Sequence, residues 1–301
     1  AQVTYVVDRN INYTNVCVSR CRFCAFSKDA GQEGEFLLTV GEILQKVEEA
    51  CNRGATRILL QGGMHPGLDA HYFRDMLSSI KKNFSIWIHG FSPPEIVFYA
   101  RLFGYSLRDF LLRLRDWGLD SIPGGGAEIP SERTRSYLSP KKCSTEEWLE
   151  VMRQAHKLGI RSTATMMFGH VETLEERVLH LERIRNLQDE TGGFDAFIPW
   201  TFQPKNTELS NLKETGATDY LRTLAVSRLF LDNIPSIQAS WVTQGPRMAQ
   251  IALFFGADDV GSTMMEENVV HAAGCKNRAL TEQEIKKLIL DAGFKPVKRR
   301  Y

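Results

Sequence analysis

The chain has 301 residues, of which 43% are hydrophobic and 24% are charged, as in an ordinary globular protein with a sizeable core. Its 37 basic and 36 acidic residues give a formal net charge of +1, which does not indicate a nucleic-acid or acidic-membrane partner. Six cysteines do not make the framework of a disulfide-rich secreted protein, and no apolar run approaches the ~20 residues of a transmembrane helix.

No signal peptide is visible at the start of the chain. The chain begins at Ala1 without methionine, which is compatible with a short piece upstream. Together with the cysteine usage, these features predict a reducing, cytoplasmic location.

Short β-branched or apolar runs alternate along the chain with amphipathic helical patterns. The runs predict eight strands, at residues 10–16, 56–61, 85–91, 119–123, 161–168, 196–202, 236–243 and 259–265. Helical patterns cover residues 40–53, 69–83, a short stretch from 93, 106–117, 144–159, 173–190, 219–233, a stretch from 246, and 281–292. The side chains of Asp69, Ser106 and Thr218 are predicted N-caps, and residues 144–147 form a capping box.

Strands that alternate with helices pair in parallel. Eight such units in one chain predict a single (β/α)8 TIM-type barrel domain over residues 1–301, with a doubly wound open sheet as the alternative. The active site of a barrel lies at the carboxyl ends of its strands. Glycines and polar residues follow the predicted strands at that end, whereas the opposite loops hold helix stops such as Gly54, Gly159 and Gly293.

Three cysteines lie on one short loop after the first predicted strand: Cys17, Cys21 and Cys24. Their C-x3-C-x2-C spacing can hold three irons of a 4Fe–4S cluster, and the fourth iron stays open because ordinary clusters take four cysteines. Zinc is a weaker interpretation, since its sites use C-x2-C pairs or added histidines and the nearest downstream histidine is His65. A disulfide with a spare thiol is weaker still. The other cysteines are scattered and are interpreted as structural: Cys51, Cys143 and Cys275.

The cysteine spacing, with the aromatic Phe23 before the third cysteine, resembles that of the radical S-adenosylmethionine (SAM) enzymes. The resemblance continues through IPGGGAEI (122–129), MMFGHVE (166–172), QDETGGF (188–194), FIPWTFQP (197–204) and ADDVGST (257–263). These phrases resemble the radical SAM group of aminofutalosine synthases, cyclic dehypoxanthine futalosine synthases and FO synthase subunits. The Ile-Pro-Trp version at residues 198–200, followed by Gln203-Pro204, is most similar to the cyclic dehypoxanthine futalosine synthases.

The resemblance implies two cofactors, one 4Fe–4S cluster and SAM. A flavodoxin- or ferredoxin-type donor would reduce the cluster, and SAM would then split into methionine and a 5′-deoxyadenosyl radical. The expected substrate is a nucleoside-type molecule bearing a benzoate, dehypoxanthine futalosine. Loss of its ribose C4′ hydrogen would be followed by ring closure onto the benzoate, in menaquinone biosynthesis. Chemistry like that of aminofutalosine synthase or FO synthase is the alternative inside the group, and a purely electron-transferring iron–sulfur protein is the alternative from another class.

The resemblance also implies SAM contacts. Phe23 is expected near the adenine, and Gly62-Gly63 is expected at the methionine amino group, with a plain turn as the alternative. Residues 165–172 resemble an element that lines the adenine, although Thr165 stands where the group has glycine. Glu128 can accept hydrogen bonds from ribose hydroxyls or be an ordinary solvated glutamate. The predicted SAM-binding residues are Phe23, Gly62, Gly63, Ser92, Glu128, Gly169 and Glu172.

The base that would remove the final proton has three candidates, His170, His65 and Glu128. Imidazole titrates near neutrality, but a lone histidine is also commonly a satisfied core residue. Arg247 begins a predicted helix and can bind a substrate carboxylate there or simply be exposed. The tryptophans can form an aromatic wall or belong to the core. The predicted substrate-binding residues are Trp200, Gln203, Trp241, Arg247 and Ser262.

Overall fold

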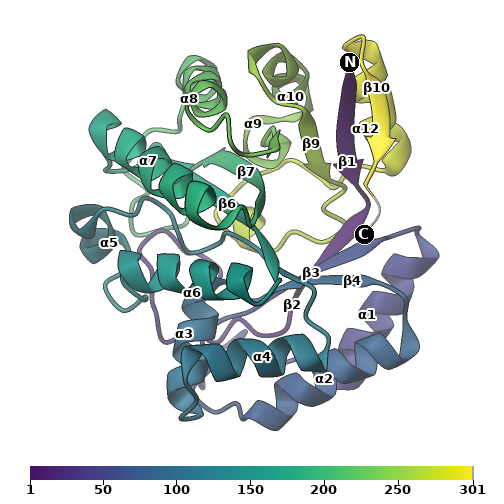
Figure 1. Cartoon of the computed structure of the whole chain (residues 1–301), viewed down its shortest axis with the longest axis vertical. Coiled ribbons are helices and arrows are strands. Elements are labelled where there is room, and N and C mark those ends of the chain that lie inside the picture. The colour runs from purple at the N-terminus through teal and green to yellow at the C-terminus, as the bar shows by residue number, and fades with distance from the viewer. Residues whose placement is uncertain (300–301) are drawn as a thin grey trace.

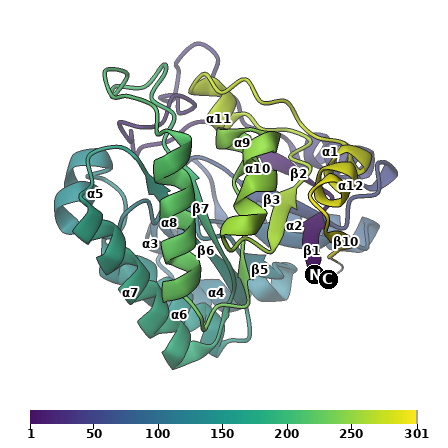
Figure 2. The same cartoon turned by 90° about the horizontal axis from the view of Figure 1, so that it is seen from above.

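The structure is a computed structural model that describes residues 1–299. Seven parallel strands form one sheet in sequence order: β2 (Asp8–Asn12), β3 (Arg57–Gln61), β4 (Trp87–Gly90), β5 (Ser121–Ile122), β6 (Arg161–Phe168), β7 (Phe194–Thr201) and β8 (Ser236–Ile237). The sheet curves so that the helices lie outside it (Figures 1 and 2). With β9 (Asp259–Ser262) as the eighth strand, the predicted TIM-type (β/α)8 fold is confirmed.

Strand β9 completes the circle between β8 and β2. Gln238, just after β8, forms a parallel bridge with Asp259 of β9. On its other side β9 pairs with β1 (Gln2–Val6), the strand that leads directly into β2, and β1 also pairs with β10 (Lys295–Lys298). The Thr263 hydroxyl accepts a hydrogen bond from the Asp8 amide at 3.1 Å and donates one to the Asp8 carbonyl at 2.9 Å. This double contact joins the end of β9, the eighth strand of the barrel, to β2, the first strand of the barrel.

The helices pack around the strands, as Figures 1 and 2 show. They are α1 (Val40–Asn52), α2 (Ala70–Asn83), α3 (Pro93–Leu102), α4 (Leu107–Trp117), α5 (Glu132–Leu138), α6 (Thr145–Lys157), α7 (Leu174–Thr191), α8 (Ala217–Phe230), α9 (Trp241–Gln244), α10 (Pro246–Ala252), the 3₁₀ turn η1 (Leu253–Phe255), α11 (Val269–Ala272) and α12 (Glu282–Asp291). The predicted N-caps Asp69 and Ser106 and the predicted capping box at Ser144 are present.

The core lies between the strands and the helices. The helices contribute side chains with no exposed surface, such as Val47 of α1, Phe73 of α2 and Phe110 of α4. They pack against strand residues such as Ile58 and Ile88 in one connected cluster. Apolar burial of this extent supplies most of the stability of the fold and holds the strand ends in place.

Several predicted elements differ from those observed. The first strand was predicted at residues 10–16, but β2 ends at Asn12 and the residues after it form only isolated bridges. The strand predicted over 236–243 stops at Ile237, because the chain then turns into α9 and buries Trp241. Thr218 was wrongly predicted as an N-cap, since α8 begins two residues earlier than predicted, at Ala217, with Gly216 at the N-cap position. Strands β1 and β10 and helices α5 and α11 were not predicted.

The described residues, 1–299, include no helix that is both long enough and apolar enough to cross a membrane.

Replacing Thr263 with valine tests the barrel closure. The two side chains are nearly isosteric, so the change removes the hydroxyl and leaves the buried Asp8 amide without its partner. We expect the free energy of unfolding to fall by about 1–3 kcal/mol in urea denaturation.

Thr145→Val is the matched control. Thr145 is equally buried, and its hydroxyl has no hydrogen-bond partner in the described part of the chain. This substitution should leave stability unchanged or slightly raised, because an unpaired buried hydroxyl is lost. Equal losses in the two variants would contradict the role given to Thr263.

Candidate functional site

The cysteine loop follows β2 at the carboxyl end of the barrel. The Cys17 amide donates to the Lys28 carbonyl at 3.0 Å, and the Val18 amide donates to the Met64 carbonyl at 3.1 Å. The Cys24 amide donates to the Cys21 carbonyl at 3.0 Å, which tightens the turn between them. All three thiols are free and line one cavity of about 190 Å³, which we call the cysteine cavity.

Among the described residues that line the cysteine cavity, Lys142 is the half-buried cation. The Lys142 ammonium lies 3.0 Å from Glu128 Oε1 and 4.9 Å from the centre of the Phe23 ring. Burial alone would lower the pKa of Lys142, but the negative charges of Cys21 and Glu128 outweigh it and raise that pKa. Burial raises the pKa of the Cys21 thiol to about 11, while the charge of Lys142 acts in the opposite direction. Lys142 therefore favours the thiolate form that metal ligation requires.

Two glycines after β3 allow the backbone to pass directly under the cysteine loop. A Cβ atom on Gly63 would lie 2.1 Å from the Val16 carbonyl oxygen and 2.9 Å from Cys17 Cβ. A Cβ atom on Gly62 would lie 2.5 Å from the Tyr13 ring. Both positions line the cysteine cavity, so glycine is required there by close approach.

Glu95 of α3 joins the loop after β3, which contains Gly62, to the loop after β4, which contains Ser92. Its Oε1 accepts hydrogen bonds from the Tyr13 hydroxyl at 2.6 Å and the Gly62 amide at 3.0 Å. Its Oε2 accepts from the Ser92 amide at 2.7 Å and the Ser92 hydroxyl at 2.6 Å. Burial raises the pKa of Glu95 and these hydrogen bonds oppose that shift. The residues predicted to contact SAM after β3 and β4 are thus positioned by one carboxylate.

Glu128 lies behind the wall of the cysteine cavity. It is 5% exposed, which excludes the alternative of a solvated glutamate. Its φ of 43° is a left-handed conformation that residues other than glycine rarely adopt, and its carbonyl accepts from the Met167 amide of β6. Besides Lys142, Arg135 lies 3.7 Å from its carboxylate. Glu128 is linked to the cysteine cavity through its hydrogen bond with Lys142, because Lys142 lines that cavity.

The His170 segment is bound to its own loop. His170 Nε2 lies 2.9 Å from the Met167 carbonyl, and Nδ1 accepts from the Val171 amide at 2.7 Å. Both ring nitrogens are therefore engaged, which favours the interpretation as a satisfied core histidine. Burial raises the pKa of Glu172, but hydrogen bonds from His170 and the Gly169 amide lower it to about 2. Arg177 pairs with this carboxylate at 2.7 Å.

The other predicted catalytic histidine, His65, makes a local contact. Its Nδ1 accepts from the Gly67 amide at 3.0 Å. Among the described residues, the lining of the cysteine cavity includes Phe23, Gly62, Gly63 and Ser92 but not His65, Glu128, His170, Gly169 or Glu172. The roles given to all nine residues stay predictions.

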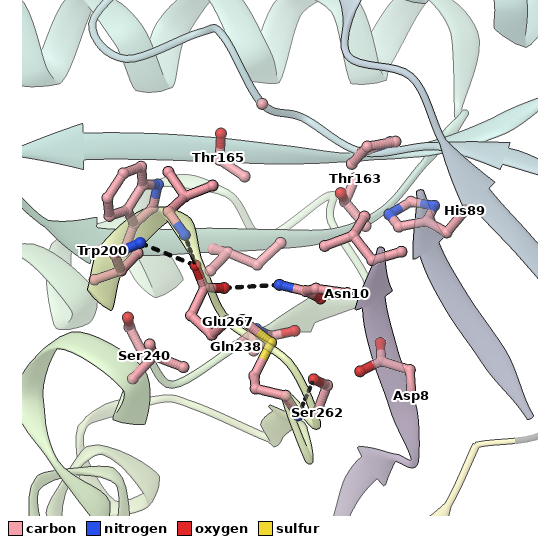
Figure 3. A pocket seen from close by; sticks show the side chains of 18 of the residues that line it. Asp8, Asn10, His89, Thr163, Thr165, Trp200, Gln238, Ser240, Ser262 and Glu267 are labelled. Atoms are coloured by element: carbon pink, nitrogen blue, oxygen red, sulfur yellow. Dashed lines mark hydrogen bonds between the residues drawn. The ribbon is translucent and has the colours of Figure 1, made fainter. Parts of the chain in front are cut away.

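A second cavity of about 280 Å³ lies inside the barrel, and we call it the barrel cavity (Figure 3). Of the predicted substrate-binding residues, Trp200, Trp241 and Ser262 line it. The Trp241 ring nitrogen donates to the Ser262 carbonyl at 3.0 Å, which fixes the indole. Gln203 is outside this lining, with its amide 3.3 Å from the Phe202 carbonyl, and Arg247 is exposed on α10.

The two cavities adjoin. Asn12, Gln61 and Val269 line both of them. Asn12 ends β2, Gln61 ends β3 and Val269 begins α11, so the shared wall stands at the carboxyl ends of the strands. A reactive group formed in the cysteine cavity would therefore face a molecule held in the barrel cavity.

Sequence reasoning missed several polar residues of these cavities. Lys142 lies in the connection after α5, a helix that was not predicted. Asp8, Asn10 and Asn12 alternate along β2 and line the barrel cavity, but the strand was placed too far along the chain for that alternation to be recognised. Glu267 also lines it, from the segment before α11.

The cysteine cavity fits the cofactors that the cysteine spacing suggests. Residues 1–299 include no group of three or more His, Cys, Asp or Glu side chains arranged around a single metal ion. The three thiols instead line one shared cavity, with the half-buried Lys142 ammonium in its wall and glycines that keep another part of the wall clear. Such a set suits an anionic iron–sulfur cluster with room for a ligand next to it.

Comparison with known proteins agrees with this site. The family model of the radical SAM superfamily matches residues 11–184, and that of the CofH/MqnC C-terminal region matches residues 191–301. The chain is 47% identical over 297 residues to a cyclic dehypoxanthine futalosine synthase of Halalkalibacterium halodurans, covering 98% of this chain and 80% of that protein. It is 43% identical over 303 residues to an aminodeoxyfutalosine synthase of Thermus thermophilus, covering 98% and 82%.

Solved structures agree on the fold. Methylornithine synthase superposes with a TM-score of 0.75 at 20% identity, over 98% of this chain and 84% of that one. The FeFe-hydrogenase maturase HydG from Carboxydothermus hydrogenoformans gives 0.73 at 16% identity, over 98% and 67%. At these identities the likeness concerns the barrel alone.

Gly63→Ala tests the close approach beneath the cysteine loop. The added methyl group would collide with the Val16 carbonyl and displace Cys17. We expect cluster affinity to fall roughly 10–100-fold, the range found when groups that orient metal ligands are lost. Iron and acid-labile sulfide per chain after anaerobic reconstitution measure this.

Gly41→Ala is the matched control. Gly41 lies in α1, and a Cβ atom added there would be 3.9 Å from its nearest neighbour, the Thr39 hydroxyl oxygen, which is an ordinary contact distance. Its iron content should equal that of the original chain. Full iron content in Gly63→Ala, with normal far-ultraviolet circular dichroism in both variants, would contradict the prediction.

Proposed function

We propose that this chain, which belongs to the radical SAM superfamily, converts dehypoxanthine futalosine into cyclic dehypoxanthine futalosine in menaquinone biosynthesis. Identities of 47% and 44% to two cyclic dehypoxanthine futalosine synthases support the proposal. The observation that carries it is the wall of Asn12, Gln61 and Val269 shared by the two cavities. A short-lived radical must form beside the bond that it attacks, and adjoining cavities provide that arrangement.

The residues of the cysteine cavity have clear tasks under this proposal. Cys17, Cys21 and Cys24 would hold the 4Fe–4S cluster, and Gly62, Gly63 and Ser92 would leave room for SAM and hydrogen-bond it. When bound and reduced, cluster and SAM together supply a 5′-deoxyadenosyl radical. Lys142 would offset the negative charge of the thiolates. Glu95 would fix the positions of the loops after β3 and β4.

The residues of the barrel cavity would bind the substrate and exclude water. Trp200 and Trp241 offer flat apolar surface to the benzoate ring, and Ser262 is close to Trp241. An enclosed apolar wall also protects a carbon radical from stray hydrogen donors while the ribose C4′ position attacks the ring. The base for the final proton, the flavodoxin- or ferredoxin-type donor and the cytoplasmic location stay predictions.

Aminodeoxyfutalosine synthase is the second candidate, because one such relative is 43% identical over almost the whole chain. That reaction, by resemblance, adds the adenosyl radical to an enolpyruvyl double bond and keeps it in the product. Free 5′-deoxyadenosine therefore distinguishes the two activities.

The proposal predicts one product in a defined assay. Anaerobically reconstituted protein is mixed with SAM, dithionite and dehypoxanthine futalosine, and the mixture is analysed by mass spectrometry. We expect a product two hydrogens lighter than the substrate together with substrate-dependent 5′-deoxyadenosine. One hydrogen leaves as an atom to the adenosyl radical, and the second leaves as one proton and one electron when aromaticity returns.

Cys24→Ala should abolish both products, and Cys51→Ala, which alters a thiol of α1 outside the loop, should retain them. Slow 5′-deoxyadenosine formation with unchanged substrate would move the chain to a sister reaction of the same superfamily. Activity that survives in Cys24→Ala would contradict the cluster assignment.

A further inference from the structure

Strand β2 presents a row of polar side chains to the barrel cavity. Asp8, Asn10 and Asn12 occupy alternate positions, so all three lie on the same face of the strand. The row begins at Asp8, beside the barrel closure, and ends at Asn12, in the wall shared with the cysteine cavity. Figure 3 shows Asp8 and Asn10 on this strand, with Glu267 beside Asn10.

Glu267 fixes the orientation of the Asn10 amide. Asn10 Nδ2 donates to Glu267 Oε2 at 2.7 Å, and Glu267 Oε1 accepts from the Val269 and Val270 amides at 2.9 Å each. Only the NH₂ side of an amide can face a carboxylate. Asn10 Oδ1 must therefore face the other way, and within residues 1–299 it has no hydrogen-bond partner although Asn10 is 7% exposed.

Asp8 repeats this pattern two residues earlier. Its Oδ2 accepts two hydrogen bonds from Arg57, from Nε at 3.0 Å and from Nη2 at 2.5 Å. Its Oδ1 has no partner in the described residues, and Asp8 has no exposed surface. Two buried oxygens on one face of one strand are thus left as acceptors, and each is costly to leave unpaired.

Unpaired acceptors select ligands that bring donors. An ionised carboxylate brings no donor to these two oxygens, whereas neutral hydroxyl groups can donate to both. An ordered water could satisfy one such oxygen, but the residues belong to a cavity large enough for part of a ligand. A ribosyl group carries several hydroxyls and suits this row.

We propose that Asn10 Oδ1 and Asp8 Oδ1 bind hydroxyl groups of the ribosyl part of the substrate, and that Glu267 is the positioning residue that turns Asn10 toward it. This inference rests on the proposed function and names the part of the substrate that β2 holds. The sugar would then lie in the barrel cavity beside Asp8 and Asn10, next to Asn12 in the wall shared with the cysteine cavity. The ribose carbon that loses hydrogen belongs to this same ring.

Glu267→Gln tests the orientation without emptying the cavity. The new carboxamide would keep its carbonyl on the two backbone amides and place its NH₂ against Asn10. Asn10 would then turn, give its oxygen to position 267 and present NH₂ to the sugar. We expect the Kd for dehypoxanthine futalosine to rise about tenfold, because the hydroxyl that donates to Asn10 Oδ1 would lose that acceptor and would have to turn its proton away to accept from NH₂.

The double variant Asn10→Asp/Glu267→Gln should restore binding to within about twofold of the original chain. It exchanges the partners of the hydrogen bond, so the carboxylate at position 10 receives the carboxamide donor and still presents an oxygen to the sugar. Glu266→Gln is the matched control, because Glu266 is the neighbouring carboxylate but is ion-paired with Arg9 and Lys46 and does not line the barrel cavity. Its Kd should not change.

Binding is measured by isothermal titration calorimetry on anaerobic, cluster-loaded protein, with dehypoxanthine futalosine and its 2′-deoxy and 3′-deoxy analogues. In the original chain at least one analogue should bind about tenfold more weakly, and in Glu267→Gln this penalty should shrink. If Glu267 had a merely structural role, Glu267→Gln would lower the stability of the protein without changing the ratio of the Kd for the substrate to the Kd for each analogue.

The outcomes separate the two proposals. If the original chain neither binds nor converts dehypoxanthine futalosine, the proposed function is wrong. If it does both, but Glu267→Gln binds substrate and analogues as the original chain does, the inference about β2 is wrong while the function stands.

Discussion

The contact between Asp8 and Thr263 is the one on which the rest of the structure depends. It joins β9 to β2 through both backbone groups of Asp8, so it closes the barrel and fixes the direction in which β2 leaves the closure. The side chain of the same residue pairs with Arg57 of β3 and lines the barrel cavity. Four residues later β2 ends at the wall of the cysteine cavity, and the cysteine loop follows. The short strand β2 therefore sets the positions of the barrel closure, the barrel cavity and the cysteine loop relative to one another.

The cysteine cavity concentrates charge that an apolar barrel would otherwise exclude. Lys142, Glu128 and Arg135 are all largely buried, and isolated charges there would be costly. Lys142 is satisfied by Glu128 on one side and faces Cys21 on the other. Three thiolates gathered in one loop repel one another, so a fixed cation beside them lowers the cost of their ionisation. This arrangement favours an anionic group in the cavity.

The sequence predicted the elements whose signals are local. The range of β6 was correct, and α2 and α4 began at the predicted caps Asp69 and Ser106, because a cap and a 3.6-residue period are written within a few residues. The cysteine loop is equally local. The strand predicted at 236–243 failed because Trp241 is apolar for a tertiary reason, its burial against β9, and not because it belongs to a strand. Lys142, Glu95 and Glu267 could not be assigned either, since their partners are distant in sequence or in segments without a regular pattern.

The division into two cavities bears on how one fold supports several reactions. The cysteine cavity is built from backbone, glycines and cysteines that any enzyme of the superfamily needs, and its task is the same whatever the substrate. Under the proposed function, differences between a cyclase and an adenosyl-adding enzyme must therefore arise in the barrel cavity, where the substrate would bind. There, the orientation of a single amide can decide which polar group of a substrate is bound, because a buried polar group left without a partner costs more than a matched hydrogen bond gains. The Glu267–Asn10 pair makes that choice in this chain through one hydrogen bond of 2.7 Å. Substrate preference within this group of enzymes can thus change by exchange of a few cavity residues while the barrel and the cysteine loop stay the same.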